Sequence, residues 1–180
     1  MEKIKKFFVD YNGTIGRIFI NHIAMSIFGL LTGLGAYGVH PLLYWGAMLL
    51  GIGMYMFLLY MIMWELGSKE SVEVEYGRME KSNFKGLIIS LVTNSLFILA
   101  GLVSVILSFF ASTRGVAGSI ALPLQVFVHS IYLPLFTTFS GFFPMLLIVL
   151  IPELVVSALS YWAGVSGKRC LFPNGQKSKK

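Results

Sequence analysis

Glu153 is the residue with the clearest chemical potential, because it lies near the middle of the apolar stretch LLIVLIPELVVSALSYWAG. A carboxylate at the centre of a membrane helix costs about 2.5–3.5 kcal/mol on insertion scales, so it is expected to be neutral, paired or beside a watery cavity. Pro152, directly before it, removes a backbone donor and favours a kink. A kinked helix with a buried acid is typical of an ion or proton site.

A purely structural role for Glu153 stands beside this interpretation. Proline is favoured at the first position of a helix, and a negative charge in the first turn is stabilised by the helix dipole. The stretch is therefore also consistent with two half-helices, in which Glu153 only caps the second one.

Other polar residues are predicted to lie at defined depths. With a rise of about 1.5 Å per residue from the basic ends of their helices, Asn94 is about 12 Å deep and Glu153 about 15 Å deep. Asn94 is therefore placed to donate a hydrogen bond to Glu153 in an intramembrane polar site. Nearer the helix ends, a Glu65–His22 or Glu65–Arg17 pair is expected. A simple interfacial ring of His22, Glu65 and Arg17 is the plainer alternative, because charged side chains near helix ends can reach water.

Several kinds of site are not expected. The chain has no HExxH, Walker A or GxSxG motif, and only one acidic residue deep in an apolar segment. His129 and Gln125 share a helical face, but no cysteine or carboxylate stands at ligand spacing from them. Cys170 is the single cysteine, so neither a disulfide framework nor a zinc motif is predicted. We expect no catalytic residue, no metal and no cofactor.

The composition predicts an integral membrane protein with one all-α membrane domain. The hydrophobic fraction is 56% and the charged fraction 12%, against about 25% charged residues in soluble domains. Segments of about 20 apolar residues can cross a bilayer as helices. Four such segments are expected: 18–38, 42–64, 86–110 and 142–163. The apolar stretch 116–138 is interrupted by polar residues and prolines.

The distribution of lysine and arginine predicts the threading of this bundle. Basic residues gather in an amphipathic segment 1–17, in a loop 65–85 and in a tail 164–180, and the positive-inside rule places these three parts in the cytoplasm. Two cytoplasmic termini require an even number of crossings. We therefore expect a polytopic bundle over 18–163 with four crossings, in which 116–138 is re-entrant or lies on the outer surface.

Short motifs in the stretches WELGSKESVEVEYGRMEKSNFKGL and IPELVVSALSYWAGVSGKR resemble those of small uncharacterised polytopic membrane proteins of Firmicutes, clostridia in particular. The likeness consists of an aromatic–acid–x–Gly that ends a helix, a Gly–Arg, a Lys–Gly that opens the next helix, and a Tyr–x–x–Gly that ends the last helix. These motifs are residues 64–67, 77–78, 85–86 and 161–164. The resemblance implies a bacterial plasma membrane and carries no activity or catalytic residue.

Two functions are expected from these observations. The first is a non-enzymatic accessory or assembly subunit of the cell membrane, with a second copy or another membrane protein as partner. The alternative is a small transporter or channel component with Glu153 on its path.

Basic termini attract anionic lipids by about 1 kcal/mol per basic group. No nucleic acid is expected, because topology alone explains the basic residues.

Two pairs of small residues have the spacing of helix contact faces. They are Gly29 with Gly33, and Ala47 with Gly51.

Overall fold

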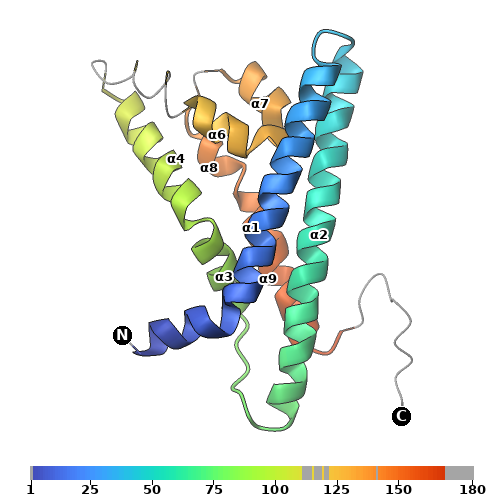
Figure 1. Cartoon of the computed structure of the whole chain (residues 1–180), viewed down its shortest axis with the longest axis vertical. Helices are drawn as coiled ribbons and strands as arrows, with labels where there is room; N and C mark the ends of the chain where they lie inside the picture. Colours follow the sequence, from blue (N-terminus) through green and yellow to red (C-terminus); the bar gives the residue numbers. More distant parts are fainter. Residues whose placement is uncertain (1, 111–114, 116–118, 120–121, 141, 169–180) are drawn as a thin grey trace.

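The two longest helices form an antiparallel hairpin. The computed structural model describes residues 2–110, 115, 119, 122–140 and 142–168, and this part of the chain contains helices and no strand. Helix α1 (Glu2–Ala36) and helix α2 (Pro41–Glu75) run side by side (Figure 1). The turn between them depends on Gly38, which has φ +77°, a conformation that glycine adopts without steric cost. His40 then caps α2, because its side chain accepts from the backbone N–H of Leu42.

The remaining helices are short or interrupted. Helices α3 (Lys85–Thr93) and α4 (Ser95–Ser108) meet at a bend of 63°. Then come α6 (Leu122–Val128), the 3₁₀ turn η2 (Ser130–Tyr132), α7 (Leu133–Thr138), α8 (Met145–Ile148) and α9 (Ile151–Val165). Figure 1 places α6, α7 and α8 in the half of the molecule that holds the turn between α1 and α2.

The two ends of the molecule differ in charge. We call the end with the α1–α2 turn the hairpin end. The opposite end holds the N-terminus, the connection between α2 and α3 and the end of α9 (Figure 1). We call it the basic end for the side chains that it carries. Among the described side chains, these are Lys5, Lys6, Arg17, Lys69, Arg78, Lys81, Lys85 and Lys168.

Within the described residues, three helices are long and apolar enough to cross a membrane. They are Lys5–Ala36, Pro41–Glu75 and Met145–Val165, and the bent pair α3–α4 makes a fourth if it crosses as one broken span. The expected all-helical class is thus confirmed for the described part of the chain, which contains candidate membrane-spanning helices. The expected segment 142–163 corresponds to α8 and α9 together.

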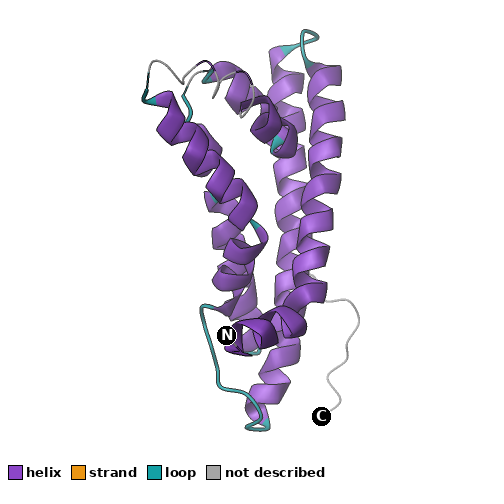
Figure 2. Ribbon diagram, turned by 60° about the vertical axis from the view of Figure 1, so that its left-hand side comes forward, coloured by secondary structure: helices purple, strands orange, loops and turns teal. Residues whose placement is uncertain are grey.

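The first turns of α1 lie across the axis of the hairpin at the basic end, as Figures 1 and 2 both show. The helix nevertheless continues without interruption from Glu2 to Ala36. The location of segment 1–17 on a membrane surface stays a prediction, and a helix lying across the bundle is the shape that such a location requires.

Helix α4 diverges from the hairpin toward the hairpin end (Figures 1 and 2). The space beside the hairpin is filled by an apolar cluster to which η2, α7 and α8 contribute. Its buried members are Met25, Tyr55, Ile131, Tyr132, Phe136, Phe143, Leu146 and Val149. The described part of the stretch 116–138 is therefore a core element of this half, while residues 116–118, 120 and 121 lie outside the described residues.

Glycine allows α9 to approach its neighbours closely. A Cβ atom on Gly164 would lie 2.5 Å from the carbonyl oxygen of Trp64 in α2, and a Cβ on Gly67 would collide with the Tyr161 carbonyl. A Cβ on Gly86 in α3 would lie 2.7 Å from the Ser157 carbonyl oxygen. Helix α9 is thus packed backbone to backbone against both α2 and α3, as membrane helices pack through small residues.

The predicted contact faces Gly29–Gly33 and Ala47–Gly51 are also used. A Cβ on Gly29 would collide with the backbone of Ile131, and a Cβ on Gly33 would lie 3.0 Å from Leu133. A Cβ on Gly51 would lie 3.6 Å from Ile131. These faces hold η2 and α7 against the hairpin.

Two predicted boundaries are wrong. The expected loop 65–85 is mostly helix, because α2 continues past Trp64 to Glu75. Buried positions recur at helical spacing beyond the expected end, at Gly67 and Glu70, so packing against α9 sustains the helix. The expected continuous span 86–110 is broken at Asn94, where α3 ends and α4 begins.

Candidate functional site

Glu153 lies in the first turn of α9 and is 2% exposed. The helix begins at Ile151 because Pro152 has no N–H to donate to a preceding turn. Glu153 thus occupies a helix N-terminus, which favours a negative charge, and it is buried among side chains from other helices. Its role as an ion or proton site stays a prediction.

Asn94 is the first partner of Glu153. Its Nδ2 donates to Oε1 of Glu153 over 2.6 Å and also to the carbonyl oxygen of Ser90 over 3.0 Å. Asn94 is 1% exposed and forms the junction at which α3 ends and α4 begins. The contact predicted from helix depth is present, and it ties the bend of α3–α4 to the start of α9.

His22 of α1 is the second partner. Its Nδ1 lies 3.5 Å from Oε2 of Glu153 and 2.9 Å from the hydroxyl of Tyr55 in α2. The ring of His22 also stacks on Phe97, with centroids 5.1 Å apart. The prediction of His22 in an interfacial ring with Glu65 is wrong, because His22 follows Arg17 by five residues and lies about 7.5 Å deeper along the helix.

His129 and Tyr132 close this cluster on the side of the hairpin end. Both are buried, and the ring of His129 meets the ring of His22 edge to face with centroids 5.1 Å apart. The side chain of Gln125, which the sequence pairs with His129, lies outside the described residues. We define the Glu153 cluster as a set of side chains from five parts of the fold. They are Glu153, Asn94, His22, Tyr55, Phe97, His129 and Tyr132.

The Glu153 cluster holds an acid and a base in a nearly dry interior. Charges buried away from water must be paired and hydrogen-bonded to be tolerated. One proton shared by Glu153 and His22 gives the pair zero net charge, and loss or gain of a proton leaves a net charge there. Among the described residues, no group of three or more histidine, cysteine, aspartate or glutamate side chains is arranged to hold a metal.

A second buried acid, Glu70, lies at the basic end. It is 6% exposed and accepts hydrogen bonds from the hydroxyls of Tyr11, over 2.7 Å, and of Tyr161. Lys85 Nζ lies 2.6 Å from Oε2 of Glu70 and 5.3 Å from the ring centre of Tyr11. We call these four residues the Glu70 cluster. It joins α1, α2, α3 and α9 through one carboxylate.

The predicted pair of Arg17 and Glu65 is present on the surface of the basic end. Their charged groups are 3.3 Å apart, and Lys69 Nζ lies 2.7 Å from the same carboxylate. The side chains are 58%, 42% and 71% exposed in the order Arg17, Glu65, Lys69. Exposed pairs of this kind contribute about 0–1 kcal/mol, so this part of the predicted ring is an ordinary surface feature.

The short motifs that carry the clostridial resemblance converge at the basic end. The motif 64–67 supplies Gly67, the motif 85–86 supplies Lys85 and Gly86, and the motif 161–164 supplies Tyr161 and Gly164. These residues make the close crossings of α9 and two members of the Glu70 cluster. Residues distant in the sequence thus build one small region of the structure.

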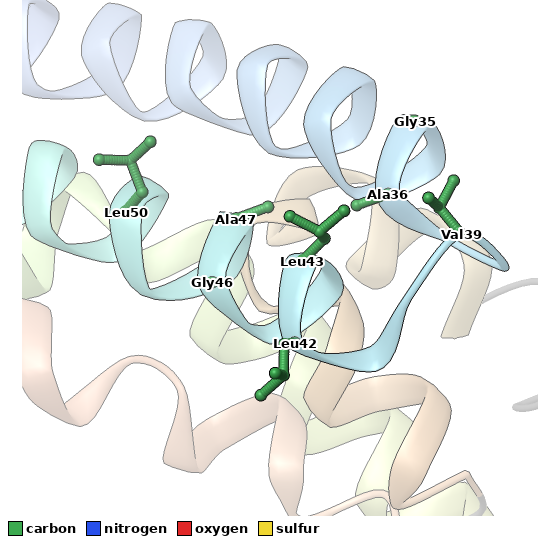
Figure 3. Close-up of a pocket in the computed structure, with 8 residues that line it drawn as sticks. All are labelled: Gly35, Ala36, Val39, Leu42, Leu43, Gly46, Ala47 and Leu50. Atoms are coloured by element: carbon green, nitrogen blue, oxygen red, sulfur yellow. The ribbon is translucent and has the colours of Figure 1, made fainter.

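A surface groove in the described part of the chain lies away from both clusters. It has a volume of about 410 Å³ and follows the seam between the last turn of α1 and the first turns of α2 (Figure 3). Its lining is Gly35, Ala36, Val39, Leu42, Leu43, Gly46, Ala47 and Leu50. None of these side chains carries a polar or ionisable group, so this groove lacks the acid and base groups of the two buried clusters.

Fold and clusters define an all-helical protein with membrane-spanning helices and buried acidic residues. Comparison with known protein families, with curated proteins and with solved structures finds no match for this chain. The resemblance to clostridial membrane proteins therefore stays a prediction.

Proposed function

We propose that this chain is a small transport component of the cell membrane that conducts protons through the Glu153 cluster. The observation that carries the proposal is the contact of Glu153 with His22 over 3.5 Å, between helices and away from the surface. Ionisable residues within membrane segments are costly to keep, and chains of acidic and histidine side chains form the proton relays of pumps and transporters.

Interrupted helices at the Glu153 cluster support this proposal. The α3–α4 pair bends by 63° at Asn94, and the helical pattern is also interrupted between α8 and α9, directly before Pro152. Broken helices place helix ends beside the binding sites of many transporters. A bend at a residue that itself binds Glu153 allows a change of helix geometry to alter the environment of the carboxylate.

The proposed topology has four crossings with both termini in the cytoplasm. It takes the bent α3–α4 pair as one broken span, and it takes the basic end as cytoplasmic under the positive-inside rule. The described part of 116–138 then lies in the outer half as a re-entrant element, and its helices α6 and α7 stay in the half with the α1–α2 turn (Figure 1).

The Glu153 cluster favours the transport alternative over an accessory or assembly subunit. A subunit that only holds partners has no use for a buried acid–base pair, whose desolvation costs several kcal/mol per ion before pairing. A partner subunit, a second copy and anionic lipids at the basic termini remain compatible with the proposal. The proposal involves no covalent chemistry and no enzyme activity.

Reconstitution tests the proposal. The purified chain is placed in liposomes with a pH-sensitive dye inside, and a potassium diffusion potential drives protons inward. We expect acidification faster than in empty liposomes, and we expect Glu153→Gln to abolish the difference. Glu65→Gln is the matched control, because this carboxylate is a member of the exposed surface pair. Equal acidification by the wild type and Glu153→Gln contradicts the proposal.

A further inference from the structure

Helices α3 and α9 face one another with a polar stripe on each. On α9, Glu153, Ser157 and Tyr161 follow at intervals of four residues, so they share one face. On the α3 side, Ser90 precedes Asn94 by four residues and follows Gly86 by four. Each stripe runs from the level of the Glu153 cluster toward the basic end.

Contacts at both ends fix the register of the two stripes. At the inner end, Asn94 donates to Glu153 over 2.6 Å. At the other end, Gly86 is so close to α9 that a Cβ on it would collide with Tyr161 and lie 2.7 Å from the carbonyl oxygen of Ser157. Ser90 and Ser157 lie between these two contacts along their helices.

The hydroxyls of Ser90 and Ser157 are buried and unsatisfied. Both residues are 0% exposed, and neither Oγ has a hydrogen-bond partner within the described structure. An unsatisfied buried hydroxyl costs about 1–3 kcal/mol, and a buried serine on a helix ordinarily avoids this cost by bonding to a carbonyl of the preceding turn. A bound water that bridges such groups removes the cost.

Neighbouring hydroxyls on the same helices show the ordinary arrangement. Thr93 Oγ1 donates to the Ile89 carbonyl over 2.9 Å, and Ser160 Oγ donates to the Val156 carbonyl over 2.5 Å. The two orphaned hydroxyls are therefore not a general property of α3 and α9. They are confined to the stripe that leads from Glu153 to the basic end.

The Glu70 cluster connects this stripe to the surface. Tyr161, the last member of the α9 stripe, donates its hydroxyl proton to Glu70. Glu70 in turn contacts Lys85, whose side chain is 14% exposed. Polar side chains thus follow one another from the surface of the basic end to Glu153 and His22.

We infer that Ser90 and Ser157 hold bound water between α3 and α9, and that this water carries protons between the Glu70 cluster and Glu153. Each transfer forms one O–H bond and breaks another. The Glu153 carboxylate takes a proton from the water, the water regains one from the Tyr161 hydroxyl, and a protonated Glu70 restores the tyrosine. The water and Tyr161 return to their starting state, Glu153 is left protonated, and Glu70 is left as a carboxylate beside Lys85 that takes its next proton from the basic end. The inference rests on the proposed function, because this route has a use only in a protein that conducts protons through the Glu153 cluster.

Time-resolved infrared spectroscopy after a pH jump tests the route with the proton itself as probe. The full chain is reconstituted in liposomes, and the carboxylic C=O band that Glu153→Gln removes is followed. We expect the double variant Ser90→Ala/Ser157→Ala to slow the protonation of Glu153 by about tenfold or more. Thr93→Val/Ser160→Ala is the matched control, because it removes two hydroxyls from the same helices that are already bonded to their own backbone.

Tyr161→Phe is a second variant, which removes only a hydroxyl and keeps the ring in place. We expect it to slow the same protonation step as well, so the test survives if the serine double variant fails to fold. Unchanged protonation rates in Ser90→Ala/Ser157→Ala and in Tyr161→Phe overturn the route. If Glu153→Gln still abolishes proton flux in that case, the proposed function stands and protons reach Glu153 from the hairpin end.

Discussion

The amide nitrogen of Asn94 lies 2.6 Å from Oε1 of Glu153 and joins the bend of α3–α4 to the first turn of α9. This single hydrogen bond crosses between two interrupted helices. It is buried, and the other oxygen of the same carboxylate, Oε2, lies 3.5 Å from Nδ1 of His22. A change in the bend of α3–α4 therefore acts directly on the group that the proposal assigns to proton exchange.

The Asn94–Glu153 hydrogen bond is predicted to stabilise the fold measurably. We expect a double-mutant cycle of Asn94→Ala and Glu153→Ala to give a coupling energy of about 1–2 kcal/mol, the upper range for polar contacts between membrane helices. The measurement is reversible unfolding in detergent micelles. Ser95→Ala serves as the control partner, because its hydroxyl bonds to the Val92 carbonyl three residues earlier. Additive effects of Asn94→Ala and Glu153→Ala contradict this prediction.

The crossing of α2 and α9 is predicted to tolerate no side chain at Gly164. A Cβ there would lie 2.5 Å from the Trp64 carbonyl oxygen, so the helices must separate, and we expect Gly164→Ala to lower the free energy of unfolding by about 1–3 kcal/mol. Gly53→Ala is the matched control on α2, because a Cβ at Gly53 meets nothing within 4 Å. Alanine there is expected to be neutral or stabilising, by up to about 1 kcal/mol. If Gly164→Ala and Gly53→Ala change the free energy of unfolding equally, the close packing of α2 against α9 is contradicted.

Removal of the Glu70 carboxylate is predicted to be costly. Glu70→Ala leaves Lys85 and two tyrosine hydroxyls without their shared acceptor, and we expect a loss of about 2–3 kcal/mol in unfolding free energy. Glu65→Ala removes an acid of the same charge from an exposed pair and is expected to cost about 0–1 kcal/mol. Thermal unfolding of both variants measures the difference. A loss from Glu70→Ala no larger than that from Glu65→Ala rules out a stabilising role for the Glu70 cluster.

The proposed topology predicts which side of the membrane each connection faces. In a Cys170→Ser background, we expect Val39→Cys at the hairpin end to react with a membrane-impermeant thiol reagent added outside intact cells. Asn83→Cys, between α2 and α3, is expected to react only after the cells are opened. Both positions are exposed in the structure. Labelling of Asn83→Cys in intact cells reverses the proposed orientation.

Depth along a straight helix was the most informative quantity in the sequence. The contact of Asn94 with Glu153 is predictable, because both residues lie in apolar segments whose basic ends can be recognised and whose rise per residue is fixed. The same rule separates His22 from Arg17, because the five residues between these positions place His22 about 7.5 Å deeper along the helix. A ring of Arg17, His22 and Glu65 at one level is therefore too coarse a prediction, and only Arg17 reaches Glu65.

The Glu70 cluster was not predicted, because composition marks the end of an apolar segment and not the end of a helix. The run after Trp64 is polar, and this composition predicts a loop. Its buried positions, however, continue the helical spacing of Leu59 and Met63 through Gly67 to Glu70. That periodicity was the available signal. The partners Tyr11 and Tyr161 depend on the tertiary packing of α1 and α9, which no local pattern specifies.

The break at Asn94 was also beyond local patterns. The stretch 86–110 is mostly apolar and holds no charged residue, and a single asparagine in such a stretch is compatible with a continuous helix. The bend arises where Asn94 turns from α3 into α4 and bonds to a residue distant in the sequence. Tertiary contacts decide such a position.

Helix α2 has 35 residues, which corresponds to a length of about 52 Å, whereas the hydrocarbon layer of a bilayer is about 30 Å thick. In the proposed orientation, the surplus places Glu70 among the lipid head groups, with the first turns of α1 lying across the same level (Figure 1). Hydrophobic mismatch then sets how far Glu70 stands from bulk water. The acyl-chain length of the host lipid becomes a control on proton delivery that requires no change in the protein. Liposomes of short-chain and long-chain lipids with equal protein content should therefore acidify at different rates, and equal rates would exclude this control.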